Sequence, residues 1–188
     1  MQSFKKNVMG SKRMYEIAFV GLKPGVHEFN YELDTTFFKE KAAENEDDVL
    51  ANVKLMLDKN NGFMLLKFIV GGNAAVHCDR CGNPLKVDLW DEFNMVVKLT
   101  EDAQKANDEE DDADVFYIEK SESHIDVSDW LYEFVILSIP MQHICGNDSY
   151  GKSLCNEDVL KKLEQMQLKS DEQKENSIWK GLDKFKNN

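Results

Sequence analysis

Positive charge, cysteine and long apolar runs are all scarce in this chain. Its 188 residues hold 23 lysines and arginines against 35 acidic side chains, for a formal net charge of −12. A molecule with that charge repels phosphate, which argues against general binding to naked duplex nucleic acid. No apolar stretch approaches the roughly 18 to 20 residues that cross a bilayer, and the N-terminus lacks the apolar region of a signal peptide. We therefore expect a cytoplasmic protein with no membrane partner.

The four cysteines are too few for a disulfide scaffold. In a reducing cytosol, a close pair of cysteines instead indicates a metal site or redox chemistry. The apolar content of 42% is sufficient for a hydrophobic core, and the length suits one domain of ordinary size.

Alternating apolar residues predict strands in the first half of the chain. Val49 to Leu57 is apolar at every second position, and Phe63 to Val70 is apolar except for one lysine. Asn61-Gly62 between them is a strong signal for a hairpin turn. A further extended segment follows over residues 85–99. We expect an antiparallel meander of roughly five to seven strands.

Helices are predicted in the second half. From Trp130 the apolar residues recur at helical spacing, and this helix must stop before Pro140. Residues 157–166 carry a second apolar stripe. The predicted fold class is α+β, an antiparallel meander with two or three packed helices and a four-cysteine cluster.

The predicted domain organisation has three parts. Residues 1–14 form a flexible leader, and residues 15–168 form a single α+β domain. Within it, residues 101–114 hold eight acids and one lysine, which predicts a mobile acidic loop. Residues 169–188 form a polar linker and a C-terminal amphipathic helix, which either packs on the body or binds a partner.

The cysteines are the candidate metal ligands. Cys78 and Cys81 form a Cys-x-x-Cys at a tight turn, and Cys145 and Cys155 form a second, more widely spaced pair. Two pairs brought together suit tetrahedral thiolate coordination of Zn²⁺ in a structural role. The nine residues between Cys145 and Cys155 would need an excursion of the chain.

Two alternatives for the cysteines stay open. A thioredoxin-type dithiol normally begins a helix, whereas Pro84 follows this pair and breaks one. In the other alternative, the thiols carry no metal and are simply buried or exposed. His77 and His143, which lie close to cysteines in the sequence, are reserve ligands.

No catalytic residues are predicted. The sequence has no phosphate-binding glycine loop and no arguable Ser-His-Asp order, and its carboxylates lie in solvated runs. We expect neither an enzyme nor a small-molecule substrate.

A local basic rim is the candidate RNA-binding site. Arg80 and Lys86 flank the first cysteine pair, and Lys152 precedes Cys155. If the cysteines converge, these three cations would meet and could contact phosphates of a structured RNA. Scattered solvating lysines are the alternative interpretation.

The turn Cys78-Asp79-Arg80-Cys81-Gly82-Asn83-Pro84-Leu85 resembles the YceD family, described as large ribosomal RNA subunit accumulation proteins. The resemblance continues through Ile125-Asp126 and the helix ending at Pro140, and through Leu154-Cys155 to the closing NSIWKGLDKFK. The segment GLKPGVHEF at residues 21–29 is similar to the version found in Bacteroidetes-type bacteria.

The resemblance implies a bacterial, cytoplasmic and non-enzymatic factor for 23S rRNA accumulation and large ribosomal subunit assembly. Its partner would be rRNA or the pre-ribosomal large subunit, and it would act by protecting or chaperoning the RNA. The alternative is an acidic protein-interaction module that binds a basic ribosomal protein, with residues 101–114 as the attracting segment.

Overall fold

The computed structural model describes residues 14–41 and 48–174, with side chains described as far as Gln167. The predicted C-terminal helix and all but the last residue of the predicted leader lie outside the described residues. The chain divides into two compact units. The sheet unit comprises Met1–Ala75 and Lys86–Met141, and the cysteine unit comprises Val76–Leu85 and Gln142–Asn188. The single domain expected over residues 15–168 stays a prediction.

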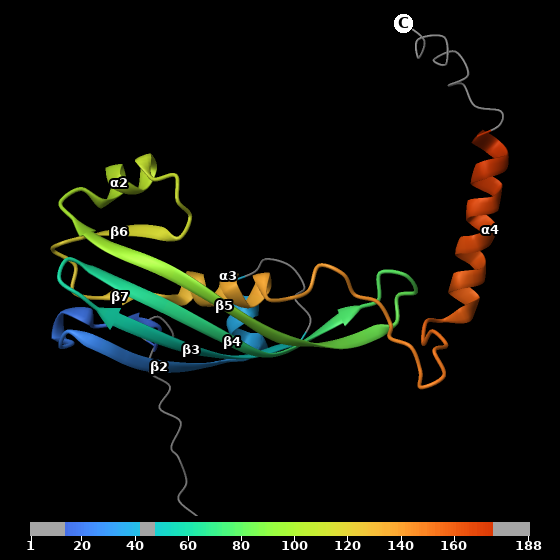
Figure 1. Cartoon of the computed structure of the whole chain (residues 1–188), viewed down its shortest axis with the longest axis horizontal. Coiled ribbons are helices and arrows are strands. Elements are labelled where there is room, and N and C mark those ends of the chain that lie inside the picture. The colour runs from blue at the N-terminus through green and yellow to red at the C-terminus, as the bar shows by residue number, and fades with distance from the viewer. Residues whose placement is uncertain (1–13, 42–47, 175–188) are drawn as a thin grey trace, which may run out of the picture. The chain divides into compact units, whose positions relative to one another are not determined.

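A five-stranded sheet dominates the sheet unit, with β2 and β6 at its two edges (Figure 1). The strands are β2 (Gly25–Leu33), β3 (Val49–Lys59), β4 (Phe63–His77), β5 (Pro84–Thr100) and β6 (Val115–Glu119). They lie in chain order, and β2 pairs antiparallel with β3, as β3 does with β4. β6 joins β5 in parallel. The expected meander is therefore confirmed, and the parallel strand makes the sheet mixed.

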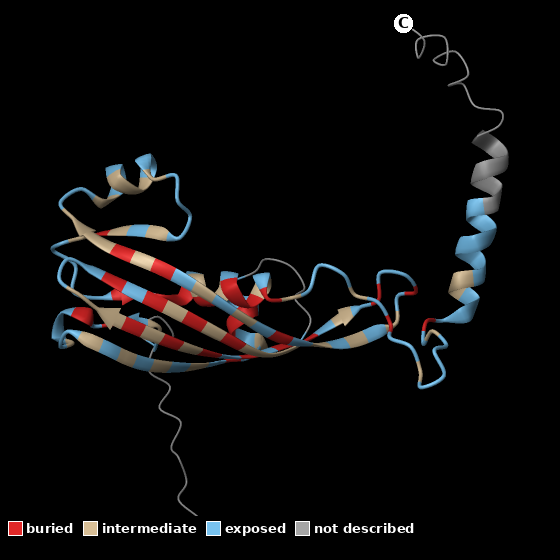
Figure 2. Cartoon of the chain, viewed as in Figure 1, coloured by how far each residue is buried: buried red, intermediate tan, exposed pale blue. Residues whose placement is uncertain are grey.

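The β3–β4 hairpin follows from its sequence. Gly62 has a φ of +88°, which a glycine adopts without strain, and the N–H of Asn60 donates to the carbonyl of Phe63 at 3.0 Å. This turn fixes a register that pairs Leu57 with Leu66. Every second residue therefore faces the same side, and the buried residues alternate along both strands (Figure 2).

Helices α1 (Thr35–Lys41) and α3 (Ser128–Leu137) supply apolar side chains to the buried side of the sheet. Phe68 of β4 contacts the rings of Trp130 and Phe134 on α3, and Phe93 of β5 stacks on Phe134 at 4.4 Å. α3 ends at Leu137, before Pro140, as predicted. A separate two-stranded sheet pairs β1 (Glu16–Ile17) with β7 (Ile125–Asp126), directly ahead of α3.

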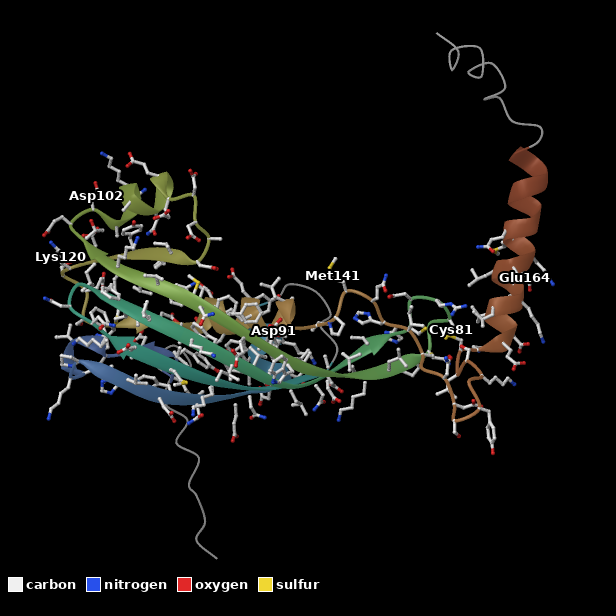
Figure 3. All side chains as sticks on the ribbon, in the orientation of Figure 1. Cys81, Asp91, Asp102, Lys120, Met141 and Glu164 are labelled. Atoms are coloured by element: carbon white, nitrogen blue, oxygen red, sulfur yellow. The ribbon has the colours of Figure 1, made fainter. Side chains whose placement is uncertain are left out.

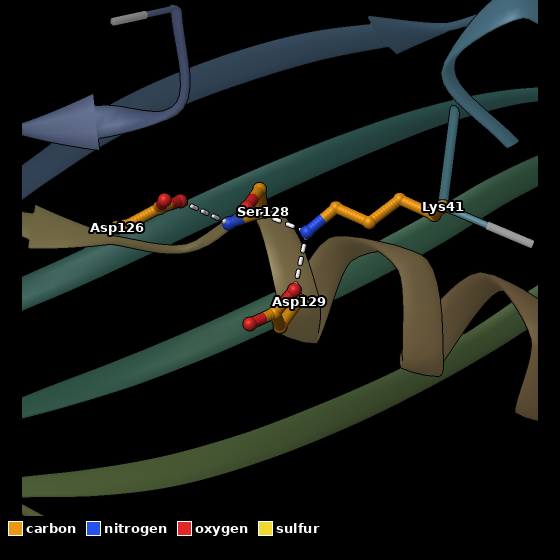
Figure 4. A network of polar contacts seen from close by, with 4 residues as sticks. All are labelled: Lys41, Asp126, Ser128 and Asp129. Carbon is orange, nitrogen blue, oxygen red and sulfur yellow. Dashed lines mark hydrogen bonds and ion pairs between the residues drawn. The ribbon is translucent and has the colours of Figure 1, made fainter. Parts of the chain in front are cut away.

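The first turn of α3 is tied to α1 by polar contacts (Figure 4). Lys41 at the end of α1 donates to the hydroxyl of Ser128 at 2.9 Å and forms an ion pair with Asp129. Asp126 accepts a hydrogen bond from the backbone N–H of Ser128 at 2.8 Å. The carboxylates of Asp126 and Asp129 thus stand at the positive N-terminal end of the helix.

Replacing Lys41 with methionine is expected to have only a small effect. The substitution keeps the apolar stem and removes the charge, but the Asp129 side chain is 83% exposed and the pair is screened by water. The free energy of unfolding should fall by less than about 1 kcal/mol. Urea denaturation checks this, with Lys39→Met as the control on the same helix. A loss above about 2 kcal/mol would mean that Lys41 is essential for docking α1.

The acidic segment contains a helix where the sequence predicted a loop. α2 (Ala103–Glu109) begins at Asp102, whose carboxylate accepts from the N–H of Lys105 at 3.1 Å. Asn107 then bonds to the main chain of Tyr117 on β6. These contacts to a distant strand offset part of the ordering cost that the charged composition alone would not meet. The mobility of residues 101–114 stays a prediction.

The cysteine unit contributes α4 (Glu157–Lys174), so the helix continues into the segment predicted as a polar linker. Asn156 begins α4 by accepting hydrogen bonds from the N–H groups of Asp158 and Val159. With four helices in the described residues, a mixed sheet and a four-cysteine cluster, the α+β class is confirmed. No helix in the described part of the chain is long and apolar enough to span a membrane.

Candidate metal centre

The first cysteine pair lies in the turn that joins β4 to β5. The N–H of Cys78 donates to the carbonyl of Asn83 at 2.8 Å, and the N–H of Gly82 donates to the carbonyl of Cys78 at 2.8 Å. Gly82 has a φ of +72°, which favours glycine. Cys81, labelled in Figure 3, is separated from Cys78 by two residues of this tight turn. The turn therefore holds both thiols close together.

The second pair is closed by a small hairpin. An antiparallel bridge joins Asn147 to Ser153, and the N–H of Leu154 donates to the carbonyl of Gly146 at 2.9 Å. At the tip, Gly151 has a φ of +81°, as expected of a three-residue loop that ends in the left-handed region. The wide spacing of Cys145 and Cys155 is thus an excursion that returns on itself, as the sequence predicted.

A polar contact joins the two pairs. The N–H of Asp79 donates to the carbonyl of His143 at 2.7 Å, and the N–H of His143 donates to the carboxylate of Asp79 at 2.7 Å. These two bonds fix residues 142–145 against the first turn. Sequence reasoning missed this contact, because a polar pair 64 residues apart leaves no local pattern.

The four sulfurs form one compact, buried cluster. Their Sγ atoms all lie within 4.8 Å of one another. The distance from Cys78 to Cys155 is 3.9 Å, and that from Cys81 to Cys145 is 3.6 Å. None of the four is in a disulfide. The side chains packed around the cluster are those of Leu85, Val159 and Leu160.

These distances suit one tetrahedral ion. Zn–S bonds of about 2.3 Å in a tetrahedron place the sulfurs about 3.8 Å apart. Two of the six separations, 3.6 Å and 3.9 Å, lie on either side of that value, and none exceeds 4.8 Å. The cluster could therefore hold a metal ion. Neither His77 nor His143 belongs to this close group of ligand atoms among the described residues.

Burial and hydrogen bonding shift the pKa values of two of the thiols in opposite directions. Burial raises the pKa of Cys78, but hydrogen bonds from the backbone of Cys145, Arg80 and Cys81 outweigh it and lower this pKa to about 6. Burial raises the pKa of Cys145, and hydrogen bonds with the three other thiols raise it further, to about 12. Without a metal, the thiol of Cys78 is thus shifted toward the thiolate and that of Cys145 toward the protonated form.

The three predicted basic residues occupy different surroundings. Arg80 is exposed in the cysteine turn. Lys152 is exposed in the hairpin but pairs with Glu157 at 2.6 Å, which raises the pKa of Lys152. Lys86 is exposed on β5 and belongs to the sheet unit. Joint contact of the three with one RNA stays a prediction.

With this geometry established, the comparison with known families becomes informative. The model of the family described as "Large ribosomal RNA subunit accumulation protein YceD" matches residues 66–186. The chain belongs to the YceD family. Neither the curated proteins nor the solved structures contain a match.

The YceD match covers most of β4, all of β5 and α3, and every cysteine. It confirms the resemblance that the sequence suggested at the cysteine turn. The similarity of residues 21–29 to a Bacteroidetes-type version lies before the matched range and stays a prediction. The family description points to a role in the accumulation of large-subunit ribosomal RNA.

Proposed function

We propose that this YceD-family protein is a non-enzymatic factor for 23S rRNA accumulation and large ribosomal subunit assembly, located in the bacterial cytoplasm. It associates with the rRNA or the pre-ribosomal large subunit and protects or chaperones the RNA. The observation that carries this proposal is the family match over residues 66–186. The family is described by the accumulation of an RNA and not by a reaction.

The cysteine cluster is proposed as a structural Zn²⁺ site. Cys78, Cys81, Cys145 and Cys155 are the ligands, supported by their burial and by the match between their separations and a tetrahedron. A zinc ion closed by four thiolates has no open position, so it supplies folding energy and no catalysis. Its role is to hold the β4–β5 turn against the hairpin that follows α3.

The distribution of charge favours the cysteine unit as the RNA-binding part. The sheet unit carries 26 acidic and 14 basic side chains, whereas the cysteine unit carries nine of each. The whole net charge of −12 therefore belongs to the sheet unit. Because phosphate is repelled by the one unit and not by the other, this argument favours Arg80 and Lys152, which belong to the cysteine unit.

Arg80, Lys86 and Lys152 are the proposed phosphate contacts. Arg80 is the strongest of the three, since it is exposed in the neutral unit and its guanidinium can pair with phosphate through two parallel bonds. Lys152 must exchange its Glu157 partner for phosphate, which reduces its net gain. Lys86, on β5 in the sheet unit, is the third proposed contact.

Reversing the charge of Arg80 and Lys86 tests this proposal. In a strain that lacks its own YceD protein, the wild-type chain should restore large-subunit rRNA and should crosslink to it. The variant Arg80→Glu with Lys86→Glu should crosslink about tenfold less, because two phosphate contacts become repulsive.

The matched control is Lys23→Glu with Lys39→Glu, which changes the net charge equally at exposed sites of the sheet unit. Equal crosslinking by both double variants would mean that the basic rim does not contact the RNA. If the wild-type chain itself leaves rRNA levels unrestored, the proposed function is wrong.

A second candidate is favoured by the same charge distribution. A unit with 26 acids and 14 bases attracts basic polypeptides at long range. The protein would then bind a basic ribosomal protein, with residues 101–114 as the predicted attractor. Deletion of that segment should abolish a salt-sensitive interaction with such a partner and leave RNA association unchanged.

A further inference from the structure

The two edges of the five-stranded sheet differ in how their main-chain polar groups are hydrogen-bonded. At β6, the side-chain amide of Asn107 donates to the carbonyl of Tyr117 at 2.9 Å and accepts from its N–H at 2.8 Å. One side chain thus makes both bonds that a further strand would make. At the opposite edge, the described residues show the main chain of β2 hydrogen-bonded to β3 alone. The other side of β2 is a row of peptide groups open to a partner.

A groove lies along this free edge. It has a volume of about 700 Å³ and is lined by two stretches of chain, Met14–Ile17 and Glu28–Glu32. Five consecutive residues of β2 border it, so its long wall is an extended main chain. A pocket of this size with an unpaired strand as its wall suits an extended peptide that adds to the sheet.

The side chains of the groove set the charge of what can enter. Glu16, Glu28 and Glu32 line it, and no lysine or arginine is among the described residues that line it. Glu28 and Glu32 lie on the same, exposed face of β2, because they are four residues apart in a strand. Lys54 on β3 already pairs with Glu28 at 3.0 Å, which shows that cross-strand pairing of opposite charges operates on this face.

The same charges exclude other occupants. RNA would be repelled by three carboxylates and by a unit that carries the whole net negative charge of the chain. A second copy of this chain, added through the same edge, would bring its own Glu28 and Glu32 against these. A basic segment with lysine or arginine at every second residue meets both the open peptide groups and the carboxylates.

We propose that β2 accepts an extended, basic polypeptide segment of a partner protein as an added strand. The proposal rests on the second candidate function, a basic protein partner, and gives that partner a binding site. It moves the site from residues 101–114 to the edge of the sheet. Main-chain hydrogen bonds supply affinity, and alternate cationic side chains supply specificity.

The test uses the full-length protein and a synthetic probe of alternating lysine and valine, about ten residues long to match the strand. The peptide should bind the wild-type chain and protect from hydrogen exchange those amides of residues 28–32 that point away from β3. A peptide methylated on every backbone nitrogen keeps the charge but has no N–H to donate on either edge, and it should bind at least about tenfold more weakly.

Two charge-reversal variants of equal net charge locate the site. Glu16→Lys with Glu32→Lys should weaken peptide binding at least about tenfold, whereas Asp108→Lys with Asp111→Lys in the acidic segment should leave it nearly unchanged. These four carboxylates are exposed, so the substitutions do not disturb the core.

Each other outcome overturns the proposal in a recognisable way. Equal binding of the methylated peptide would reduce the interaction to diffuse charge attraction. Loss of peptide binding only in the Asp108 and Asp111 variant would support the second candidate function but place its binding site at residues 101–114. Binding that requires removal of residues 1–13, which carry four basic residues and no acid, would make this chain's own N-terminus the occupant. If neither the wild-type chain nor any variant binds the peptide, the proposed site on β2 is wrong, and the rRNA proposal is still tested by crosslinking.

Discussion

Replacing Cys81 with serine is expected to abolish metal binding and to unfold the cysteine unit while the sheet unit stays folded. Four cysteines and three partly buried apolar side chains make up the core around this site. A core of that size offsets little of the ordering cost of about 1 to 2 kcal/mol per residue. A structural zinc supplies roughly 10 to 16 kcal/mol in small zinc domains. Without it, the β4–β5 turn and the hairpin lose what holds them together.

Elemental analysis and amide NMR together check this prediction. The wild-type protein, purified without chelator, should contain one zinc, and Cys81→Ser should contain none. Amide signals of residues 76–85 and 142–160 should collapse in the variant, while those of β3 and β4 up to Ala75 persist. The matched control is Leu154→Ala, since Leu154 adjoins a cysteine but is 59% exposed. Collapse of both sets of signals would instead indicate the single domain that the sequence predicts.

Acid should release the metal as well. The pKa of Cys145 is raised to about 12, so its proton must leave when the metal binds, and metal binding therefore strengthens as the pH rises. The zinc proposal would be contradicted if the wild-type protein contained no metal at any pH and had four reactive thiols, and if Cys81→Ser gave the same NMR spectrum as the wild type.

The sequence predicted the elements whose signals are local. Strand β3 alternates with a period of two, and Asn61-Gly62 forces the turn that follows, so the pattern and the register agree. Pro140 cannot continue a helix, and α3 ends before it. The four cysteines could be grouped because thiols in two pairs have few other uses in a reducing compartment.

What the sequence could not predict depends on contacts between distant residues. The helix α2 is held by Asn107 against Tyr117, and neither residue is unusual in its own neighbourhood. The bonds between Asp79 and His143 likewise join two ordinary polar residues. The open edge of β2 is a property of the sheet as a whole, since the order of the described strands decides which of them has no second neighbour.

Gly71-Gly72 is a case where sequence and structure give different reasons for the same residues. A glycine pair inside a strand typically marks a bulge or a break in the pairing, yet β4 continues through it to His77. The reason for glycine at position 72 is a close approach. A Cβ built there would lie 2.2 Å from the carbonyl oxygen of Leu50 and 2.8 Å from the Cα of Ala51. Both atoms are backbone of β3, which is paired on each side and cannot retreat.

Gly72→Ala is therefore expected to lower the free energy of unfolding of the sheet unit by about 3 kcal/mol or more. The φ of Gly72 is +143°, a conformation that costs an alanine about 1 to 3 kcal/mol, and the overlap with β3 adds a similar amount. Gly71→Ala is the matched control. Its φ is not positive, and the nearest atom to its Cβ is the carbonyl oxygen of Asn52 at 4.0 Å, so the loss should stay below about 1 kcal/mol.

Urea denaturation of the two variants distinguishes a close approach of β3 and β4 from a flexible break in β4 as the reason for the glycine pair. A much lower midpoint for Gly72→Ala alone would establish that glycine is needed because β3 and β4 approach too closely for a side chain. Equal, small shifts would mean that β4 can bend away from β3 at this point. The Gly-Gly pair would then act as a flexible break in the strand, and the pairing of Ala51 with Gly72 would contribute little to the stability of the sheet.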